Sequence, residues 1–408
     1  MAGSSEGALG FLFAIVVAFL SSLVAARFKL PVIPVLLLLA AIFGPNALGI
    51  VQEEYIEIFS NLGAILLLYV VGLKLNLRTF LEVLAPSFFL FILNVGFLSP
   101  IVAFILHIMF QVPLANALVL AFGISVTSTA IFYKAAQDFK IANKKETKLI
   151  YAKLIWEDLF IIFVITVVSQ SLTAPEFIVI LTQMLMFLIP LTIVYHIGKL
   201  FLQYIPKKAD DDIYLYFFLS LLGIVLFIGA IFNVPSSVAA FLAGILSNSY
   251  TEIQRAKQKL DFLSGLFVML FFLSIGMKAN IFDYLDIGFL LTITIILTVV
   301  VTLRVLIHSL GLTLLGINPR IGALLALLSA PTGEFAMLVA YEFKDLFEFN
   351  TISLTTAIVF FSSIITWYLG AKHHEYNQTM EKIRKKLALF IEDLKNKRRG
   401  KRYESSRN

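Results

Sequence analysis

The chain has 408 residues, of which 60% are hydrophobic and only 14% are charged. Soluble domains carry about 25% charged residues, and a soluble protein of this length could not bury so much apolar surface. The 39 Phe and the absence of Cys exclude disordered, collagen-like and disulfide-stapled proteins, and any chemistry that needs a thiol. The net charge of +6 comes from residues 371–408, which hold 12 Lys or Arg against 5 Asp or Glu. The rest of the chain is close to neutral.

Apolar stretches of about 20 residues are long enough to cross a membrane as helices. The sequence contains thirteen candidates, of which the ninth is short. They cover residues 8–26, 31–50, 56–73, 84–108, 112–133, 149–171, 177–200, 213–232, 235–249, 262–277, 286–309, 320–341 and 351–370. We therefore expect an all-α polytopic membrane protein of about thirteen transmembrane helices, with the membrane domain in residues 1–371. The first stretch is not expected to be a cleaved signal peptide, because residues 1–7 hold no Lys or Arg.

The basic residues between the spans are distributed unequally. Connections after odd-numbered spans, together with the tail, hold 28 Lys or Arg, whereas connections after even-numbered spans hold 2. Cytoplasmic connections carry such an excess. The pattern predicts an N-terminus outside the cell and a C-terminus in the cytoplasm, in a multi-pass protein of the plasma membrane.

Two strings recur at a fixed offset of 204 residues. Residues 72–76 (Gly-Leu-Lys-Leu-Asn) correspond to residues 276–280 (Gly-Met-Lys-Ala-Asn), and residues 124–129 of span five correspond to residues 328–333 of span twelve. Spans seven apart run in opposite directions, so the copies form two inverted-topology repeats with span seven as a linker. Such repeats are typical of secondary transporters that work by alternating access.

The strongest functional signal is a pair of neighbouring acids, Glu157 and Asp158, in the middle of span six. Ionisable residues within a span are costly and indicate an ion or proton pathway. Adjacent helix residues lie about 100° apart, so both carboxylates can reach one cavity. A carboxylate in such a place can hold either a proton or a cation, which is the basis of cation/proton exchange. The alternative for either acid is a structural ion pair.

Spans five and twelve each carry a polar interruption. The polar residues concerned are Ser125, Thr127, Ser128 and Thr129 in span five, and Thr332 and Glu334 in span twelve. Unwinding there would free carbonyl and hydroxyl oxygens for a desolvated cation, which predicts two broken crossing helices. We expect Thr127, Ser128 and Thr129 to complete a monovalent cation site at Asp158, and the other three to support the breaks. The alternative is hydrogen bonding between helices with one proline kink.

Two basic side chains also fall within spans. Arg304 lies deep in span eleven and keeps its proton, so we expect it to balance the charge of one of the three acids, Glu157, Asp158 or Glu334. A snorkelling arginine is the alternative. Lys153, one turn before Glu157, is expected near the cytoplasmic mouth.

The basic tail, residues 372–408, shows apolar residues at helical spacing between residues 376 and 395. This predicts an amphipathic helix that binds anionic lipid rather than nucleic acid; a solvated tail is the alternative. The sequence shows no Gly-rich phosphate loop and no Ser/His/Asp spacing, so no cofactor and no catalytic residue is expected.

Several strings resemble motifs of the monovalent cation:proton antiporter-2 family. They are residues 126–131 (Val-Thr-Ser-Thr-Ala-Ile), 156–159 (Trp-Glu-Asp-Leu), 240–246, 271–277 and 333–336, and together they extend over about residues 10–370. The resemblance implies a homodimer, with spans one to three and eight to ten as a dimerisation part. Spans four to six and eleven to thirteen would form an ion-transporting core that moves like an elevator.

The resemblance also implies roles for single residues. Asp158 takes the place of the family's ion-binding acid, Glu157 that of its variable position, and Arg304 that of its basic residue in span eleven. Glu157 departs from the Asp or amide of known members, which leaves open both Na⁺ against K⁺ and electrogenic against electroneutral exchange.

We therefore expect a secondary active antiporter that exchanges Na⁺ or K⁺ for protons and serves pH homeostasis, and not an enzyme. A gated cation channel would conduct without proton coupling, and the inverted repeat argues against it. A sodium-coupled organic anion transporter would move a solute in place of the proton. An intramembrane hydrolase would need a paired-acid site, which Asp158 and Glu334 could imitate.

Overall fold

The computed structural model describes residues 2–28, 30–50, 57–74, 81–141, 144–171, 177–206, 208–373 and 375. These residues form helices and their connections, with one isolated backbone bridge. By length and composition, seven of the helices can cross a membrane, and five more are apolar but shorter. The predicted all-α polytopic fold is confirmed. The predicted tail helix lies outside the described residues.

Each stretch predicted to span the membrane coincides with a helix or with a broken pair of helices. The first half contains α1 (Ala2–Phe28), α2 (Val32–Phe43), α3 (Glu57–Lys74), α5 (Leu84–Phe110), α6 (Leu114–Ser125), α7 (Thr129–Asp138) and α8 (Lys145–Ser171). After α9 (Phe177–Tyr204), the second half contains α10 (Asp211–Ile231), α11 (Ser236–Asn248), α12 (Ile253–Lys278), η2 (Ile281–Leu285), α13 (Ile287–Leu314), α14 (Pro319–Leu328), α15 (Phe335–Glu342), η3 (Lys344–Leu346) and a final helix, Thr351–His373. The fifth and twelfth stretches are the broken pairs α6–α7 and α14–α15.

The two halves repeat each other helix by helix at the offset that the sequence predicts. Helix α2 begins at Val32 and α11 at Ser236, whereas α5 ends at Phe110 and α13 at Leu314. Both pairs of positions are 204 residues apart. The offset of the two short strings therefore extends to the boundaries of whole helices.

Glycines fix how the repeated helices pack. A Cβ atom at Gly72 of α3 would collide with the backbone of Phe241 and Gly244 in α11. A Cβ atom at Gly276 of α12 would lie 2.9 Å from the carbonyl oxygen of Leu37 in α2. Helices approach this closely only where a side chain is missing. Because Gly276 and Phe241 follow Gly72 and Leu37 at the same offset, the two contacts are copies of each other.

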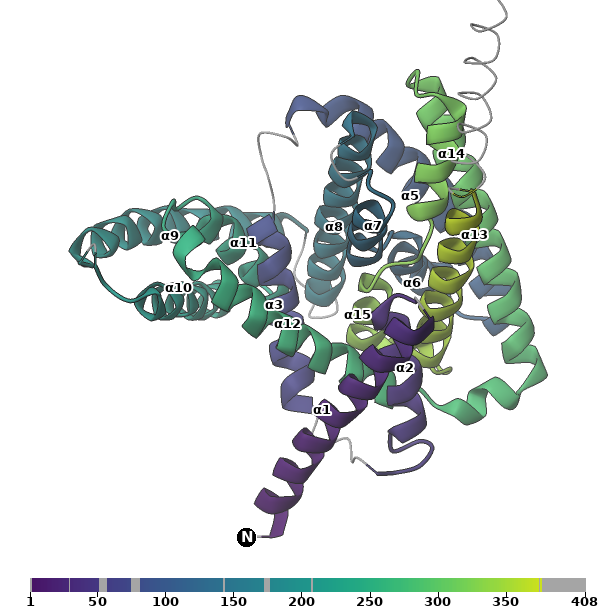
Figure 1. Ribbon diagram of the computed structural model, residues 1–408, viewed down its shortest axis with the longest axis horizontal. Coiled ribbons are helices and arrows are strands. Elements are labelled where there is room, and N and C mark those ends of the chain that lie inside the picture. The colour runs from purple at the N-terminus through teal and green to yellow at the C-terminus, as the bar shows by residue number, and fades with distance from the viewer. Residues whose placement is uncertain are drawn as a thin grey trace, which may run out of the picture.

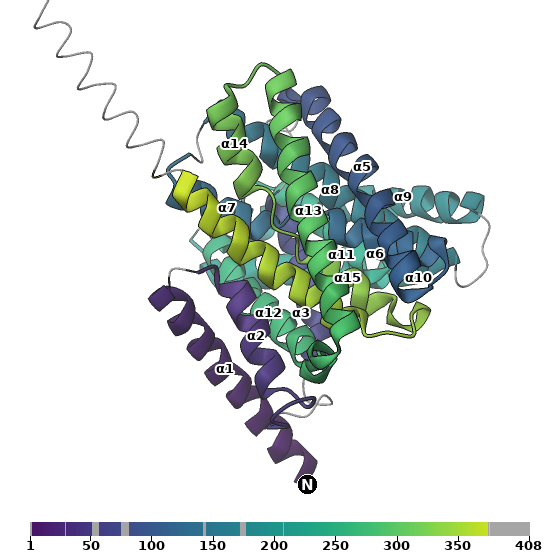
Figure 2. The same cartoon turned by 90° about the vertical axis from the view of Figure 1, so that its right-hand side faces the viewer.

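The helices pack in two groups (Figures 1 and 2). Helices α1–α3 and α10–α12 pack mainly against one another and form the first group. Helices α5–α8 and α13–α15 form the second group, which the final helix joins through the contact of Ser362 with Thr332. Helix α9 contacts α10 of the first group and α8 of the second.

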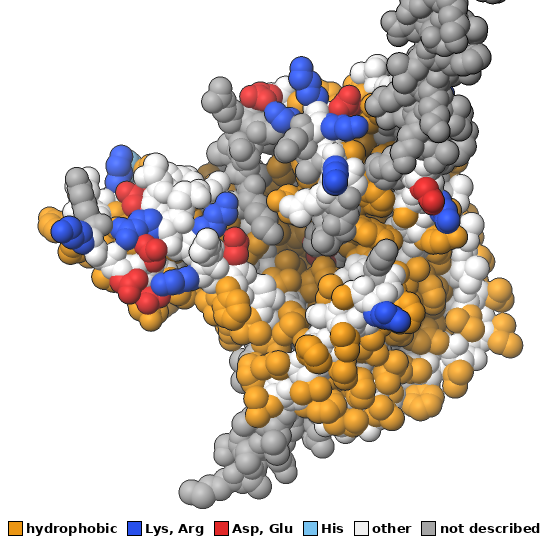
Figure 3. All heavy atoms as spheres, in the orientation of Figure 1, with side chains coloured by type: hydrophobic (Ala, Val, Ile, Leu, Met, Phe, Trp, Pro, Cys, Tyr) orange, Lys and Arg blue, Asp and Glu red, His pale blue; other side chains and the backbone are white. Residues whose placement is uncertain are grey.

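The outer surface is strongly apolar. Figure 3 shows hydrophobic side chains over the lower part of one face, with Lys, Arg, Asp and Glu gathered toward the upper end and on the projecting part. Large exposed side chains include Phe19 at 63%, Phe97 at 60% and Phe227 at 70% exposure. An apolar surface of this extent belongs against lipid. The polar groups of functional interest lie inside instead.

Candidate ion-binding site

The two helix breaks cross each other in the interior of the second group. Thr127 and Thr332, both fully buried, form an isolated antiparallel bridge, and the Gly333 amide donates a hydrogen bond of 2.8 Å to the Val126 carbonyl. A Cβ atom on Gly333 would lie 2.9 Å from the Thr127 carbonyl oxygen, so the crossing needs a glycine there. The antiparallel pairing is what inverted copies require.

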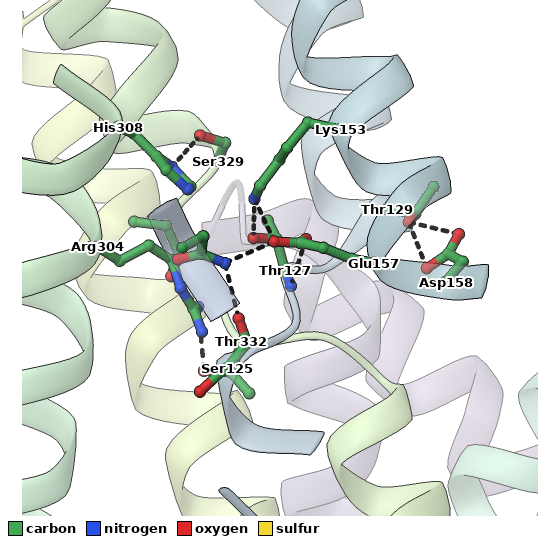
Figure 4. A network of polar contacts seen from close by, with 12 residues as sticks. Ser125, Thr127, Thr129, Lys153, Glu157, Asp158, Arg304, His308, Ser329 and Thr332 are labelled. Carbon is green, nitrogen blue, oxygen red and sulfur yellow. Dashed lines mark hydrogen bonds and ion pairs between the residues drawn. The ribbon is translucent and has the colours of Figure 1, made fainter. Parts of the chain in front are cut away.

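Arg304 of α13 binds the ends of both interrupted helices (Figure 4). Its guanidinium donates to the carbonyl oxygens of Ile124 and Ala330, each at 2.7 Å, and to the Thr332 hydroxyl at 3.3 Å. Carbonyl groups at a helix C-terminus lack partners within the helix and carry partial negative charge. We expected Arg304 to pair with an acid, but its hydrogen bonds go to these carbonyls, because two helices end within its reach.

Of the two neighbouring acids, Glu157 forms an ion pair, and its partner is Lys153. Lys153 Nζ lies 2.8 Å from Glu157 Oε1, and both side chains are fully buried. Asn94 Nδ2 donates to the same oxygen at 2.5 Å, and the Thr127 amide donates to Oε2 at 3.0 Å. Lys153 also donates to the Thr127 hydroxyl at 2.6 Å. The expectation that Lys153 lies near the cytoplasmic mouth was wrong.

Asp158 has a different environment although it is the next residue. Its side chain is 2% exposed, and the Thr129 hydroxyl at the start of α7 donates to its two oxygens at 3.3 and 3.4 Å. Figure 4 places Asp158 and Thr129 together, on the side of Glu157 away from Arg304. The Asp158 carboxylate is thus buried and weakly bonded, beside a helix break.

The remaining predicted residues stabilise the breaks. Ser128 accepts a hydrogen bond from the Ile131 amide at 3.2 Å, which caps α7, and donates to Glu334 Oε2 at 2.9 Å. Glu334 therefore joins the second break to the first. The Ser125 carbonyl oxygen accepts a hydrogen bond of 2.9 Å from Asn94.

The central residue of each break is held in the same way. The Thr127 amide donates to Glu157 Oε2 at 3.0 Å, and the Thr332 amide donates to Ser362 Oγ at 3.1 Å. Thr332 and Ser362 follow Thr127 and Glu157 by 205 residues, one residue more than the offset of 204 that relates the helix boundaries. Each break thus has its central amide bonded to a side-chain acceptor on the following long helix, which is charged for the first break and neutral for the second.

Sequence reasoning did not bring three buried polar residues into the site, namely Asn94, Lys153 and Ser362. His308 bonds Ser329 at 2.9 Å, as a hydrogen-bonded packing residue does. Two of the three residues carried a signal. Lys153 precedes Glu157 by four residues, the spacing of helical ion pairs, and Asn94 is the one amide side chain within residues 84–108. Over the described residues, no cluster of three or more His, Asp or Glu side chains suits a resident metal ion.

Comparison with known proteins decides the family. The family model described as sodium/hydrogen exchanger, transmembrane, matches residues 15–371. The chain belongs to this family. It is 23% identical over 311 residues to the probable Na⁺/H⁺ antiporter GerT of Bacillus cereus, covering 74% of this chain and 82% of that protein. It is 24% identical over 347 residues to the K⁺/H⁺ antiporter subunit KhtU of Bacillus subtilis, covering 80% of this chain and 83% of that protein.

A solved structure shares the fold of this exchanger. The sodium proton antiporter MjNhaP1 from Methanocaldococcus jannaschii aligns with a TM-score of 0.66 and 17% identity, covering 90% of this chain and 97% of that one. The resemblance to cation/proton antiporters is confirmed at the level of the family. The protein is a multi-pass membrane transporter and not an enzyme.

Proposed function

We propose that this exchanger is a secondary active antiporter that exchanges Na⁺ or K⁺ for protons at Asp158. The observation that carries the proposal is the buried carboxylate of Asp158 beside the break between α6 and α7, with Thr129 as its hydrogen-bond donor. A cation and a proton each neutralise this carboxylate and therefore compete for it. The names of GerT and KhtU support both ions as substrates.

The surroundings favour a single bound positive charge. The nearby carboxylates of Glu334 and Glu157 repel a negative charge on Asp158, and the ammonium of Lys153 attracts it. A positive ion or a proton bound at Asp158 relieves the repulsion. Hard cations bind oxygen ligands, and the Thr129 hydroxyl is within reach of the Asp158 oxygens. Ser128 and Thr127 complete the site less directly, through their contacts with Glu334 and Lys153.

The packing of the helices supports elevator-type alternating access. Both breaks, with the acids and Arg304, belong to the second group, which would be the moving core. The first group, α1–α3 and α10–α12, would hold the dimer interface of a homodimer, and α9 would link the two. The unequal distribution of Lys and Arg supports a plasma-membrane protein with its N-terminus outside and its C-terminus in the cytoplasm.

The test is replacement of the carboxylate by an amide. In proteoliposomes, Asp158→Asn removes proton movement driven by a Na⁺ or K⁺ gradient, down to the level of protein-free vesicles, because an amide neither ionises nor binds a proton here. Asp261→Asn in α12, an exposed position, makes the same chemical change and keeps the wild-type rate. Exchange at the wild-type rate in Asp158→Asn refutes the proposal.

A further inference from the structure

Lys153 and Glu157 form an ion pair one turn apart within α8. Their charged atoms are 2.8 Å apart, and neither side chain is exposed. Removing or neutralising one partner of a buried ion pair strongly destabilises the folded protein, because the other charge is then buried without compensation. The protonation states of the two groups are therefore tied to each other.

The hydrogen bonds distinguish the two neighbouring acids. Both oxygens of Glu157 are engaged, by three donors, which are Lys153, Asn94 and the Thr127 amide. These bonds are 2.5 to 3.0 Å long, whereas those of Asp158 with Thr129 are 3.3 and 3.4 Å. Glu157 organises the break, and Asp158 is the acid that can exchange its partner.

The second copy of the repeat shows what the position of Glu157 requires. Ser362 accepts the Thr332 amide there, as Glu157 accepts the Thr127 amide. A neutral hydroxyl is therefore enough to accept the central amide of a break, and this hydrogen bond does not depend on the negative charge of Glu157. The added charge of Glu157 comes with its own cation, Lys153.

The charges of the buried cluster point to one transported charge. Its ionisable members are Glu157, Asp158, Glu334, Lys153 and Arg304, which together give a formal charge of −1. The imidazole of His308, which faces Lys153 and Arg304, is counted as neutral. One proton or one monovalent cation therefore makes the cluster neutral.

We propose that Lys153 fixes the charge of Glu157, so that Asp158 alone exchanges ions and one cation moves for each proton without net charge. Asp158 releases the cation on one side and takes up one proton as a new O–H bond. Lys153 touches neither ion and is a positioning residue that sets the stoichiometry through Glu157. The inference rests on the proposed function.

The first experiment measures the balance point of the wild-type protein. Vesicles are given a Na⁺ gradient, a pH gradient and a membrane potential set by a thiocyanate gradient, and a dye reports when proton movement stops. We expect a roughly tenfold Na⁺ gradient to be balanced by about one pH unit at every potential, because equal tenfold ratios carry equal free energy. A balance point that moves with potential overturns the inference.

Variants of Lys153 test its role. Lys153→Arg keeps the positive charge and keeps the balance point independent of potential. Lys153→Met leaves Glu157 without its cation, so Glu157 takes up and releases a second proton and the balance point moves with potential. The double variant Lys153→Met/Glu157→Gln removes both charges and regains independence, at a reduced rate.

Two results contradict this role. If Lys153→Met balances as the wild type does at every potential, Lys153 does not set the stoichiometry. If the wild type depends on potential and Lys153→Met does not, Lys153 itself releases the second proton. A wild type in which no Na⁺ or K⁺ gradient moves protons refutes the proposed function, whereas coupled exchange with a potential-dependent balance refutes only this inference.

Discussion

At the scale of single residues, Arg304 shows a buried cation that serves the backbone. Its two terminal nitrogens each bind a carbonyl oxygen at 2.7 Å, one beside the end of α6 and one beyond the end of α14. Such carbonyls in a membrane interior have no water to bind. One side chain therefore satisfies both interrupted helices and holds them together.

Replacing Arg304 tests this role through stability. Arg304→Met removes the guanidinium donor from the Ala330 carbonyl and leaves the Ile124 carbonyl with the longer hydrogen bond of 3.3 Å from the Thr332 hydroxyl. A buried carbonyl that loses its donor costs about 1–3 kcal/mol, so we expect a clearly lower midpoint of thermal unfolding in detergent. The midpoint of Arg304→Lys falls between those of the wild type and Arg304→Met, because a compact ammonium group cannot reach two acceptors at once as the planar guanidinium does. Arg320→Met at an exposed position of α14 leaves the midpoint unchanged. An Arg304→Met protein as stable as the wild type contradicts the assignment.

The sequence was enough to identify the charged residues but not their partners. Counting acids and bases within spans singles out Glu157, Asp158, Glu334 and Arg304, since each charge in a membrane needs a reason. Arg304 was expected to pair with an acid because residue types do not reveal which backbone carbonyl groups a helix break leaves free to accept hydrogen bonds. Lys153 was misplaced because its side chain turns inward along α8 to reach Glu157.

At the scale of helices, prediction from sequence went further. Apolar length alone located the helices, because a spanning segment must satisfy its backbone within itself. Polar residues with Pro and Gly located both breaks. The contacts between the breaks could not be predicted, since they join Thr127 to Thr332 and depend on how two distant helices cross.

The repeated glycine contacts lead to a prediction for α3. Gly72→Ala forces α3 away from α11, because the added methyl group meets the backbone at Phe241, and we expect a loss of about 1–3 kcal/mol. Gly223→Ala in α10 has nothing within 4 Å of the new methyl group and is neutral or slightly stabilising, by up to about 1 kcal/mol. Thermal unfolding of both variants checks this. Equal midpoints for the two would mean that α3 and α11 do not need the glycine.

At the scale of the whole molecule, one of the contacts between the two helix groups places a cation over an aromatic ring. Lys278 at the end of α12 lies with its Nζ 4.7 Å from the ring centre of Tyr341 in α15. Lys344 lies against the same ring at 5.6 Å. Lys278 is only 9% exposed, and a cation over an aromatic ring gains more when it is desolvated. The contact stabilises this arrangement of the groups over any arrangement in which α12 and α15 have moved apart.

In the elevator mechanism proposed above, loss of this contact shifts the population between the two states. Tyr341→Leu removes about 1 kcal/mol from the state seen here, roughly a fivefold change in population, whereas Tyr341→Phe retains the ring and stays close to the wild type. A population shift favours one side of the membrane at the expense of the other. We expect the half-saturating cation concentration to fall on one face and rise on the other, measured in right-side-out and inside-out vesicles. Changes in the same direction on both faces would mean that Tyr341 acts on the ion site itself and not on the balance between states.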